Sequence, residues 1–312
     1  MLGREVTILR HFTKLATVVL IALPATAAFA HAEISDPVLA QKISVLLRDV
    51  FTGTNEQTTA AQAKIRDLFR ARGLPTIAQV GNDTSYDFVL LASLGQPLSF
   101  EADVLPAVRA AARKNEIPSD TAIFYLARFR LERMKESADK HAPLNPSLRD
   151  QIESLYKIDQ AVRQPAGFDK QKMIQTDRKL APVLKNIFEK YGLPTFAMVG
   201  TRAAGEFVIM VQHQSPEFRE QVLPKLKAAV DEGQADPQSF ALVYDRSQRD
   251  QGKKQLYGTQ LECKAGQNLR EAPIEDEAHV NERRAKLGLM RVQLYARLTA
   301  ESMPQFCAAE PA

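Results

Sequence analysis

The sequence predicts a mainly α-helical protein made of two related helical-bundle repeats, the second extended by a short β-hairpin and C-terminal helices. Two observations predict this fold class. Apolar residues recur at helical spacing along most of the chain, and a set of short motifs occurs twice at a nearly constant separation. With 312 residues, of which 45% are hydrophobic and 25% charged, the chain is long enough for two domains and apolar enough to bury a core.

The N-terminus has the pattern of a cleavable export signal. Basic residues precede an apolar run over residues 15–30, and small-x-small patterns place cleavage after Ala30 or Ala32. The run is shorter than the roughly 20 residues that cross a bilayer, so we expect a periplasmic or secreted protein without stable membrane insertion after cleavage. The formal net charge of +4 is too small and too scattered to indicate a nucleic-acid partner.

The repeated motifs divide the mature chain into two units. The run Gly-Leu-Pro-Thr at 73–76 recurs 119 positions later at 192–195, and the apolar stretch 88–91 matches 207–210 at the same offset. Each unit has about 100 residues, a normal size for a domain. We assign 1–30 to the signal peptide, 31–140 to a first, degenerate repeat, 141–176 to a helical connector and 177–312 to the second repeat.

Each repeat is expected to be a helical bundle. Helical spacing of apolar residues ends at Gly73 and at Gly192, each followed two residues later by proline, which is typical of a helix C-terminus. The apolar segment that follows predicts a buried central helix, with a buried strand as the alternative. A further helix opens near residue 215, and Pro224, like Pro106 in the first repeat, is expected to kink or split its helix.

The second repeat continues where the first has only a charged segment. Residues 255–261 and a short run ending at Pro273 flank the Gly/Asn turn at 266–268, which predicts a β-hairpin. We expect the first strand to carry the run from residue 255. A helix from about Glu277 and another over 289–299 are predicted to follow.

Cys263 and Cys307 are the only cysteines. In an oxidising compartment we expect them to form a disulfide, which would restrict the unfolded chain by about 3–4 kcal/mol. A metal-bound pair and a free nucleophile with a histidine partner are the alternatives. The four histidines beyond residue 30 have no metal-ligand spacing, and no phosphate loop or dinucleotide fingerprint occurs, so we expect neither a metal nor a cofactor.

Differences between the repeats indicate where a site lies. His213 aligns with Leu94 and Asp245 with Ala127, so the second repeat has polar side chains where the first has apolar ones. Burying such groups costs free energy unless they are paired or face a cavity. We therefore place the site in the second repeat, with His213 and Asp245 as candidate catalytic residues, and expect the first repeat to be structural.

Uncharged donors and acceptors cluster next to these residues in the run Gln-Leu-Tyr-Gly-Thr-Gln at 255–260. The expected ligand-binding residues are Arg246, Gln255, Tyr257, Thr259, Gln260 and Arg284. Such a set suits an anionic or amide-rich small molecule or peptide, with His213 as general base and Asp245 orienting it. The alternative is a structural network in which Asp245 and Arg246 attach the hairpin to the helices.

His213, the Tyr-Asp-Arg triplet at 244–246, the run at 255–260 and the arginine pair 283–284 resemble a family of bacterial proteins known only as a domain of unknown function. The resemblance covers about residues 178–297 and implies a shared helical fold with a hairpin and a common site, but no reaction. Two functions follow as hypotheses: a metal-independent hydrolase, or a non-catalytic module that binds a cell-envelope ligand or a partner peptide. A purely structural repeat protein is the third possibility.

Overall fold

The computed structural model describes residues 34–164, 169–263 and 269–302, which belong to one compact unit, Ile34–Ala312. Within these residues the fold is mainly α, with fourteen α-helices and one short β-hairpin, which confirms the predicted fold class. The predicted signal peptide, residues 1–30, lies outside the described residues and stays a prediction.

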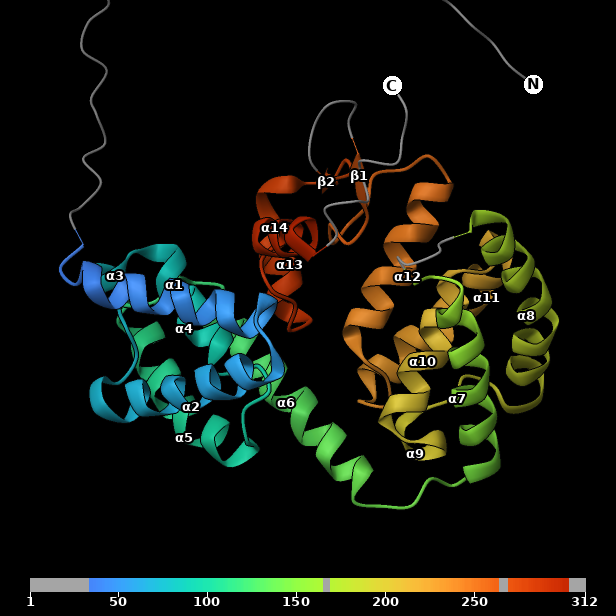
Figure 1. Cartoon of the computed structure of the whole chain (residues 1–312), viewed down its shortest axis with the longest axis horizontal. Helices are drawn as coiled ribbons and strands as arrows, with labels where there is room; N and C mark the ends of the chain where they lie inside the picture. Colours follow the sequence, from blue (N-terminus) through green and yellow to red (C-terminus); the bar gives the residue numbers. More distant parts are fainter. Residues whose placement is uncertain (1–33, 165–168, 264–268, 303–312) are drawn as a thin grey trace, which may run out of the picture. The chain divides into compact units, whose positions relative to one another are not determined.

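The first six helices surround an apolar core (Figure 1). They are α1 (Pro37–Thr52), α2 (Asn55–Arg72), α3 (Ile77–Val80), α4 (Asn82–Leu91), α5 (Leu98–Arg113) and α6 (Thr121–Asp139). Helix α4 supplies Phe88, Val89 and Leu91, none of which is exposed to solvent. The predicted central apolar segment is therefore a buried helix and not a strand.

The next six helices enclose a second apolar core (Figure 1). They are α7 (Pro146–Ala161), α8 (Lys170–Tyr191), α9 (Phe196–Val199), α10 (Thr201–Gln212), α11 (Pro216–Asp231) and α12 (Pro237–Asp250). Helix α10 contacts each of the other five and contributes the fully buried Phe207, Met210 and Val211. Its C-terminus carries His213, so the second core positions that side chain.

Short segments of the two groups of helices share their local geometry. Helices α2 and α8 end at Gly73 (φ 71°, ψ −156°) and Gly192 (φ 73°, ψ −157°), a conformation that glycine adopts without steric cost. Thr76 and Thr195 then cap the short helices α3 and α9 with their hydroxyl groups. The duplication of whole repeats and the boundaries drawn from it stay predictions.

The two prolines for which the sequence predicts a kink or a split lie inside continuous helices. Pro106 is within α5 and Pro224 is within α11. The predicted splitting of these helices at the prolines is therefore wrong. Each removes one backbone hydrogen bond. The flanking side chains Val104 and Val222 are fully buried, and this packing keeps the chain helical on both sides of the proline.

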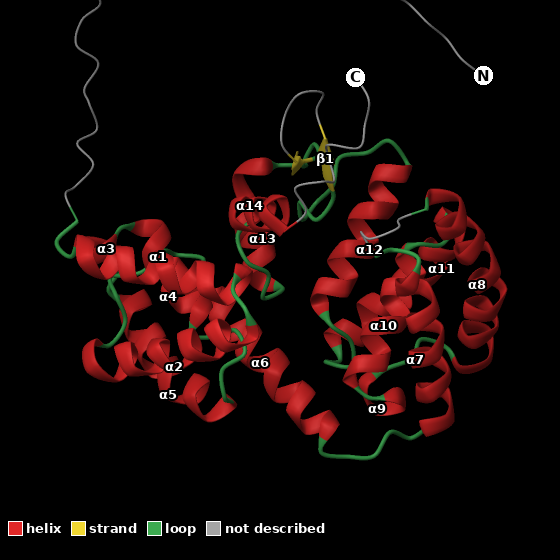
Figure 2. Cartoon of the chain, viewed as in Figure 1, coloured by secondary structure: helices red, strands yellow, loops and turns green. Residues whose placement is uncertain are grey.

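The hairpin and the last helices follow α12 (Figure 2). Strands β1 (Leu261–Cys263) and β2 (Leu269–Glu271) pair antiparallel, with Leu261 opposite Glu271, so the predicted hairpin is confirmed. Its strands are shorter than expected, and residues 256–260 form a loop. A 3₁₀ turn, η1 (Glu277–His279), then leads to α13 (Val280–Lys286), which packs on α6, and α14 (Val292–Ser302), which contacts β2 and α1.

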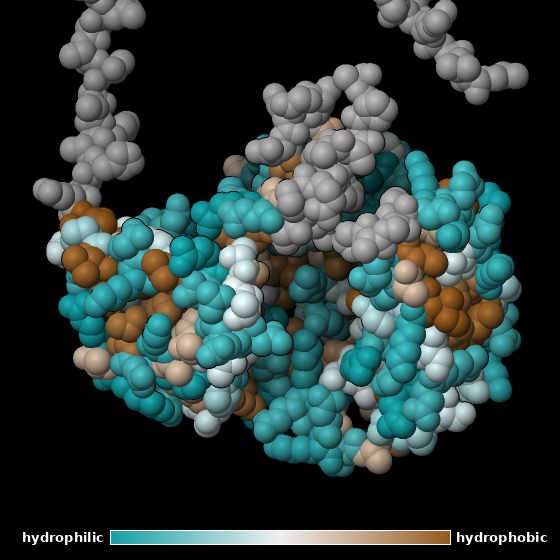
Figure 3. Space-filling view, in the orientation of Figure 1, coloured by the Kyte–Doolittle hydropathy of each residue, from teal (hydrophilic) through white to brown (hydrophobic). Residues whose placement is uncertain are grey.

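The surface of the described residues carries both hydrophilic and hydrophobic side chains. Hydrophilic residues cover much of the face in Figure 3, with hydrophobic patches between them. Among the described residues the exposed large hydrophobic side chains are Val38, Ile123, Met134, Leu144 and Ile158. No described helix combines the length and the apolar composition that crossing a membrane requires.

Candidate functional site

Asp245 holds the loop that follows α12. Its carboxylate is fully buried: Oδ1 accepts hydrogen bonds from the backbone N–H groups of Leu256 (2.8 Å) and Tyr257 (3.0 Å). Oδ2 accepts from the N–H (2.9 Å) and the hydroxyl (2.8 Å) of Thr259. Burial raises the pKa of this carboxyl, and the hydrogen bonds oppose the rise. These bonds replace the ladder of a strand, which is why 256–260 is a loop.

Other predicted ligand-binding residues also hold this loop. Gln255 is not exposed, and its side-chain amide donates to the carbonyls of Gln260 (2.9 Å) and Ala272 (2.7 Å). Arg284 donates to the carbonyl of Tyr257 (2.6 Å), and burial lowers its pKa to about 10. Gln255, Thr259 and Arg284 therefore bind backbone groups of the chain itself, which is the structural alternative drawn from the sequence.

Tyr257 and Gly258 occupy the tip of the loop. The Tyr257 ring packs edge-on against the rings of Tyr244 (5.8 Å between centroids) and Phe240 (6.2 Å). Gly258 has φ 69°, and a Cβ atom there would lie 2.5 Å from Val292 Cγ2. Only glycine fits this position, so it permits the close approach of the loop to Val292 at the start of α14.

His213 pairs with an aspartate that the sequence did not single out. Its Nδ1 lies 3.1 Å from Oδ1 of Asp159, a residue of α7 with no solvent exposure. The expected pairing with Asp245 is not formed, because both Asp245 oxygens are occupied by the loop. An ionised carboxylate only accepts hydrogen bonds, so Nδ1 is the donor in this pair. The His213 side chain is 16% exposed, which leaves it accessible from solvent.

Arg163 connects this pair to a second aspartate. Its guanidinium contacts Asp159 (3.0 Å) and Asp177 of α8 (2.6 Å). Potential ligand atoms of Asp159, Asp177 and His213 all lie within 4.8 Å of one another, a spacing that could hold a metal ion. The carboxylate oxygens facing this space are bonded to Arg163, whose charge takes the place that a cation would fill. The arrangement therefore favours an ionic cluster over a metal site.

Arg246 differs from the arginines around it. It donates from Nε to the side-chain oxygen of Gln260 at 3.0 Å and has no carboxylate partner among the described residues. Burial lowers its pKa, and the charge of Arg163 lowers it further. Nearby Arg219 is paired with Asp250, and burial together with the charge of Arg246 lowers its pKa too. Arg246 is thus a desolvated cation without a carboxylate partner in the described part of the chain.

The structure brings part of the predicted site together. Arg246 contacts Gln260, and His213 contacts Asp159, which pairs with Arg163; the charge of Arg163 also lowers the pKa of Arg246. Sequence reasoning missed Asp159 and Arg163, although a signal exists: Asp159 continues the inward-facing positions Leu148, Ile152 and Leu155 of α7. A carboxylate on a buried helix face marks a residue with a specific partner. Cys263 lies in β1, and Cys307 lies outside the described residues, so their disulfide stays a prediction.

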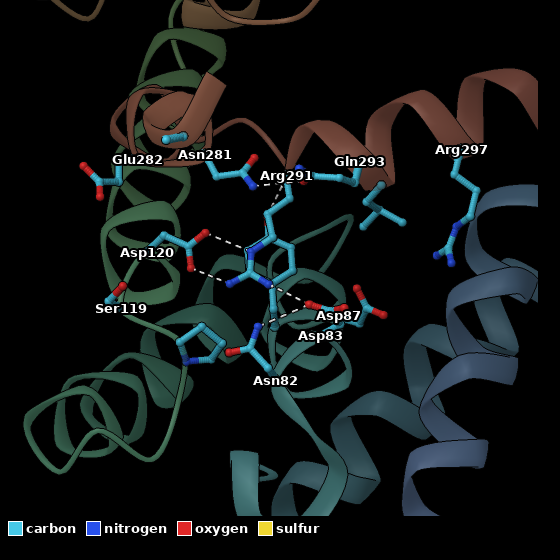
Figure 4. A pocket seen from close by; sticks show the side chains of 14 residues that line it. Asn82, Asp83, Asp87, Ser119, Asp120, Asn281, Glu282, Arg291, Gln293 and Arg297 are labelled. Atoms are coloured by element: carbon cyan, nitrogen blue, oxygen red, sulfur yellow. Dashed lines mark hydrogen bonds and ion pairs between the residues drawn. The ribbon is translucent and has the colours of Figure 1, made fainter. Parts of the chain in front are cut away.

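A separate cavity of about 610 Å³ contains none of the predicted site residues (Figure 4). Arg291, at the start of α14, lies at its centre and pairs with Asp120 (2.7 and 2.9 Å) and Asp83 (3.1 Å). Its guanidinium also lies 4.3 Å from the ring centroid of Tyr86. Asp87 faces the same cavity, and burial raises its pKa to about 6. Arg291 thereby attaches α14 to α4 and α6.

A family of unknown function (DUF6624) matches residues 146–304, just over half of the chain, and the chain belongs to this family. The match begins with α7, further toward the N-terminus than the resemblance over 178–297, and includes Asp159, His213 and Arg246. No curated protein and no solved structure matches the chain.

Proposed function

We propose that this member of DUF6624 binds an anionic group of a small molecule or peptide at Arg246, and that it hydrolyses this ligand with His213, positioned by Asp159, as general base. The observation that carries the proposal is the desolvated guanidinium of Arg246, which lacks a carboxylate partner in the described part of the chain. An anion would neutralise it, and the gain is large where water is excluded.

Two connections relate Arg246 to His213. Arg163 contacts Asp159, the partner of His213, and lies close enough to Arg246 to lower its pKa. Arg219, whose pKa is lowered by the charge of Arg246, donates to the backbone carbonyl of Gln212, the neighbour of His213. A ligand bound at Arg246 is therefore in the neighbourhood of the imidazole.

The histidine pair suits acid–base catalysis. The Nε2 lone pair of His213 takes a proton from water as the water oxygen bonds to the carbonyl carbon of the ligand. Asp159 accepts the Nδ1–H hydrogen bond throughout and stabilises the imidazolium that forms. The imidazolium then gives the proton to the leaving amine or alcohol. No metal takes part in this sequence.

Anion binding is tested with inorganic phosphate as the probe. We expect phosphate to shift the ¹⁵Nε NMR signal of Arg246 more than chloride does at equal ionic strength. Arg246→Gln should weaken phosphate binding by about tenfold or more, since a hydrogen bond to a charged group contributes roughly 1.5–3 kcal/mol. Arg109→Gln is the matched control, because Arg109 is exposed and distant from the cluster. Equal shifts with phosphate and chloride would contradict the proposal.

Turnover is tested separately with cell-wall fragments and with peptides that end in a free carboxylate. A hydrolase should release product with the native protein and lose this release in His213→Ala while ligand binding persists. The second candidate is a binding module without turnover. It is favoured by the absence, among the described partners of His213, of a serine or cysteine nucleophile. Binding without product from either protein would select this second function.

A further inference from the structure

A second buried charged group lies outside the Arg246 site, on α5. Glu101 is 2% exposed, and its Oε2 atom has no hydrogen-bond partner among the described residues. It lines a cavity of about 310 Å³ between α5 and α6. A buried acceptor without a donor costs free energy, so a site of this kind indicates a missing partner.

The cavity has an excess of acidic groups. Its charged lining residues are Glu101, Arg128, Glu132, Lys135, Glu136 and Asp139. Lys135 contacts Asp236 at 2.8 Å, and Arg128 contacts Glu132 at 2.8 Å through Nη2, while its Nε has no hydrogen-bond partner among the described residues. Glu101 therefore has no counter-ion of its own, although the charge of Arg128 lies close to it.

We propose that this cavity binds a small alkylammonium ion, with the Glu101 carboxylate as its counter-ion. An ammonium group supplies the N–H donors that the carboxyl lacks, and Leu98 provides an apolar wall for a short alkyl chain. A metal ion is disfavoured, since the one trio of potential metal ligands in the described residues does not include Glu101. This site is independent of the hydrolase proposed for Arg246.

Binding to Glu101 is coupled to a proton. Burial raises the pKa of the Glu101 carboxyl to about 8; the charge of Glu132 raises it further, and that of Arg128 opposes the rise. At neutral pH the empty site is thus mainly protonated, and an ammonium ion that binds the carboxylate displaces this proton. The affinity for an ammonium ion should then increase about tenfold between pH 6 and pH 7. Tyr125 and the α6 residues above are the other titratable groups at this position.

The test follows the ¹³C NMR signals of glutamate carboxyls in the full chain, with ethylammonium chloride as the probe. We expect one signal to titrate near pH 8 and to disappear in Glu101→Gln, which keeps the shape of the side chain. Ethylammonium should move this midpoint to lower pH, and sodium chloride at equal ionic strength should not. Glu56→Gln, the same change at an exposed position on α2, should leave signal and shift intact.

Two results would overturn the proposal. The first is the absence of any glutamate signal titrating near pH 8 in the native protein. The second is an equal midpoint in ethylammonium chloride and in sodium chloride. Both are read from the native chain, so they decide the matter even if Glu101→Gln does not fold.

Discussion

The helix pairs α5–α6 and α11–α12 carry charged side chains at three corresponding positions. Two of the positions have the same charge in both pairs, and the third has opposite charges. The residues correspond at an offset of 118: Glu101 with Arg219, Arg128 with Arg246, and Glu132 with Asp250. Glu101 of α5 interacts electrostatically with Arg128 of α6, and Arg219 of α11 interacts in the same way with Arg246 of α12.

The difference decides which group is left without a partner. In α5–α6, Arg128 forms an ion pair with Glu132, and the buried Oε2 atom of Glu101 is left without a hydrogen-bond partner among the described residues. In α11–α12, Arg219 forms an ion pair with Asp250, and Arg246 is left without a carboxylate partner among the described residues. The two helix pairs thus leave groups of opposite charge without an ion-pair partner among the described residues, and the two proposed sites rest on this difference. Both helix pairs, and not only the second, then become candidates for binding.

The largest effect is expected from a substitution that releases the loop at 256–260, which follows α12 and has no counterpart among the described residues after α6. Asp245→Ala introduces the residue found at Ala127 and leaves three backbone N–H groups of the loop without an acceptor. We expect the free energy of unfolding to fall by about 3–5 kcal/mol, measured by urea denaturation. Asp231→Ala, which removes an exposed ion pair with Lys227, should change it by less than about 0.5 kcal/mol. Equal losses in the two variants would mean that the loop does not depend on Asp245.

An intermediate effect sharpens the comparison through pH. Because the pKa of Glu101 is raised to about 8 in the folded state, the native chain keeps a proton that the unfolded chain releases above about pH 4.5. This contribution to stability is complete below the unfolded pKa and is lost as pH rises to about 8. Urea denaturation across this range should therefore show a flatter profile for Glu101→Gln than for the native chain. If the free energy of unfolding varied with pH in the same way in the native chain and in Glu101→Gln, the raised pKa of Glu101 would be contradicted.

The smallest expected effect is a change in which ring nitrogen of His213 carries the hydrogen. In the native protein we expect His213 to be the Nδ1–H tautomer when neutral, because Asp159 accepts from Nδ1. Asp159→Asn offers an amide that can donate, so the tautomer should change to Nε2–H, as read from long-range ¹⁵N NMR of the imidazole. Asp276→Asn is the matched control, since Asp276 pairs with the exposed His279 and with Arg283 and has no contact with His213. The same His213 tautomer in the native protein and in Asp159→Asn would remove Asp159 as the positioning residue.

Helix boundaries could be predicted because their causes are local. Gly73 and Gly192 each end a helix through the conformation of a single residue. The run at 255–260 was expected in a strand because its residue types suit one. A buried carboxylate ten residues earlier binds its N–H groups instead, and no local pattern encodes this competition.

The site was predictable only in part for the same reason. The contrast of His213 with Leu94 directs attention to a polar group, which the structure pairs with a buried aspartate. Its partner Asp159 lies 54 positions earlier on another helix, and Glu101 reads as an ordinary charged residue until its burial is known. Pairings between distant elements depend on packing, which spacing along the chain does not contain.

The attachment of Arg291 has a practical consequence for isolating the part of the chain that DUF6624 covers. A fragment that begins at Pro146 would keep Arg291 but lose Asp120, Asp83 and Tyr86, which bind its guanidinium in the full chain. Helix α13 would lose α6, its packing neighbour. The stretch recognised as a family is thus smaller than the part that folds together, and expression of the fragment alone should yield frayed C-terminal helices.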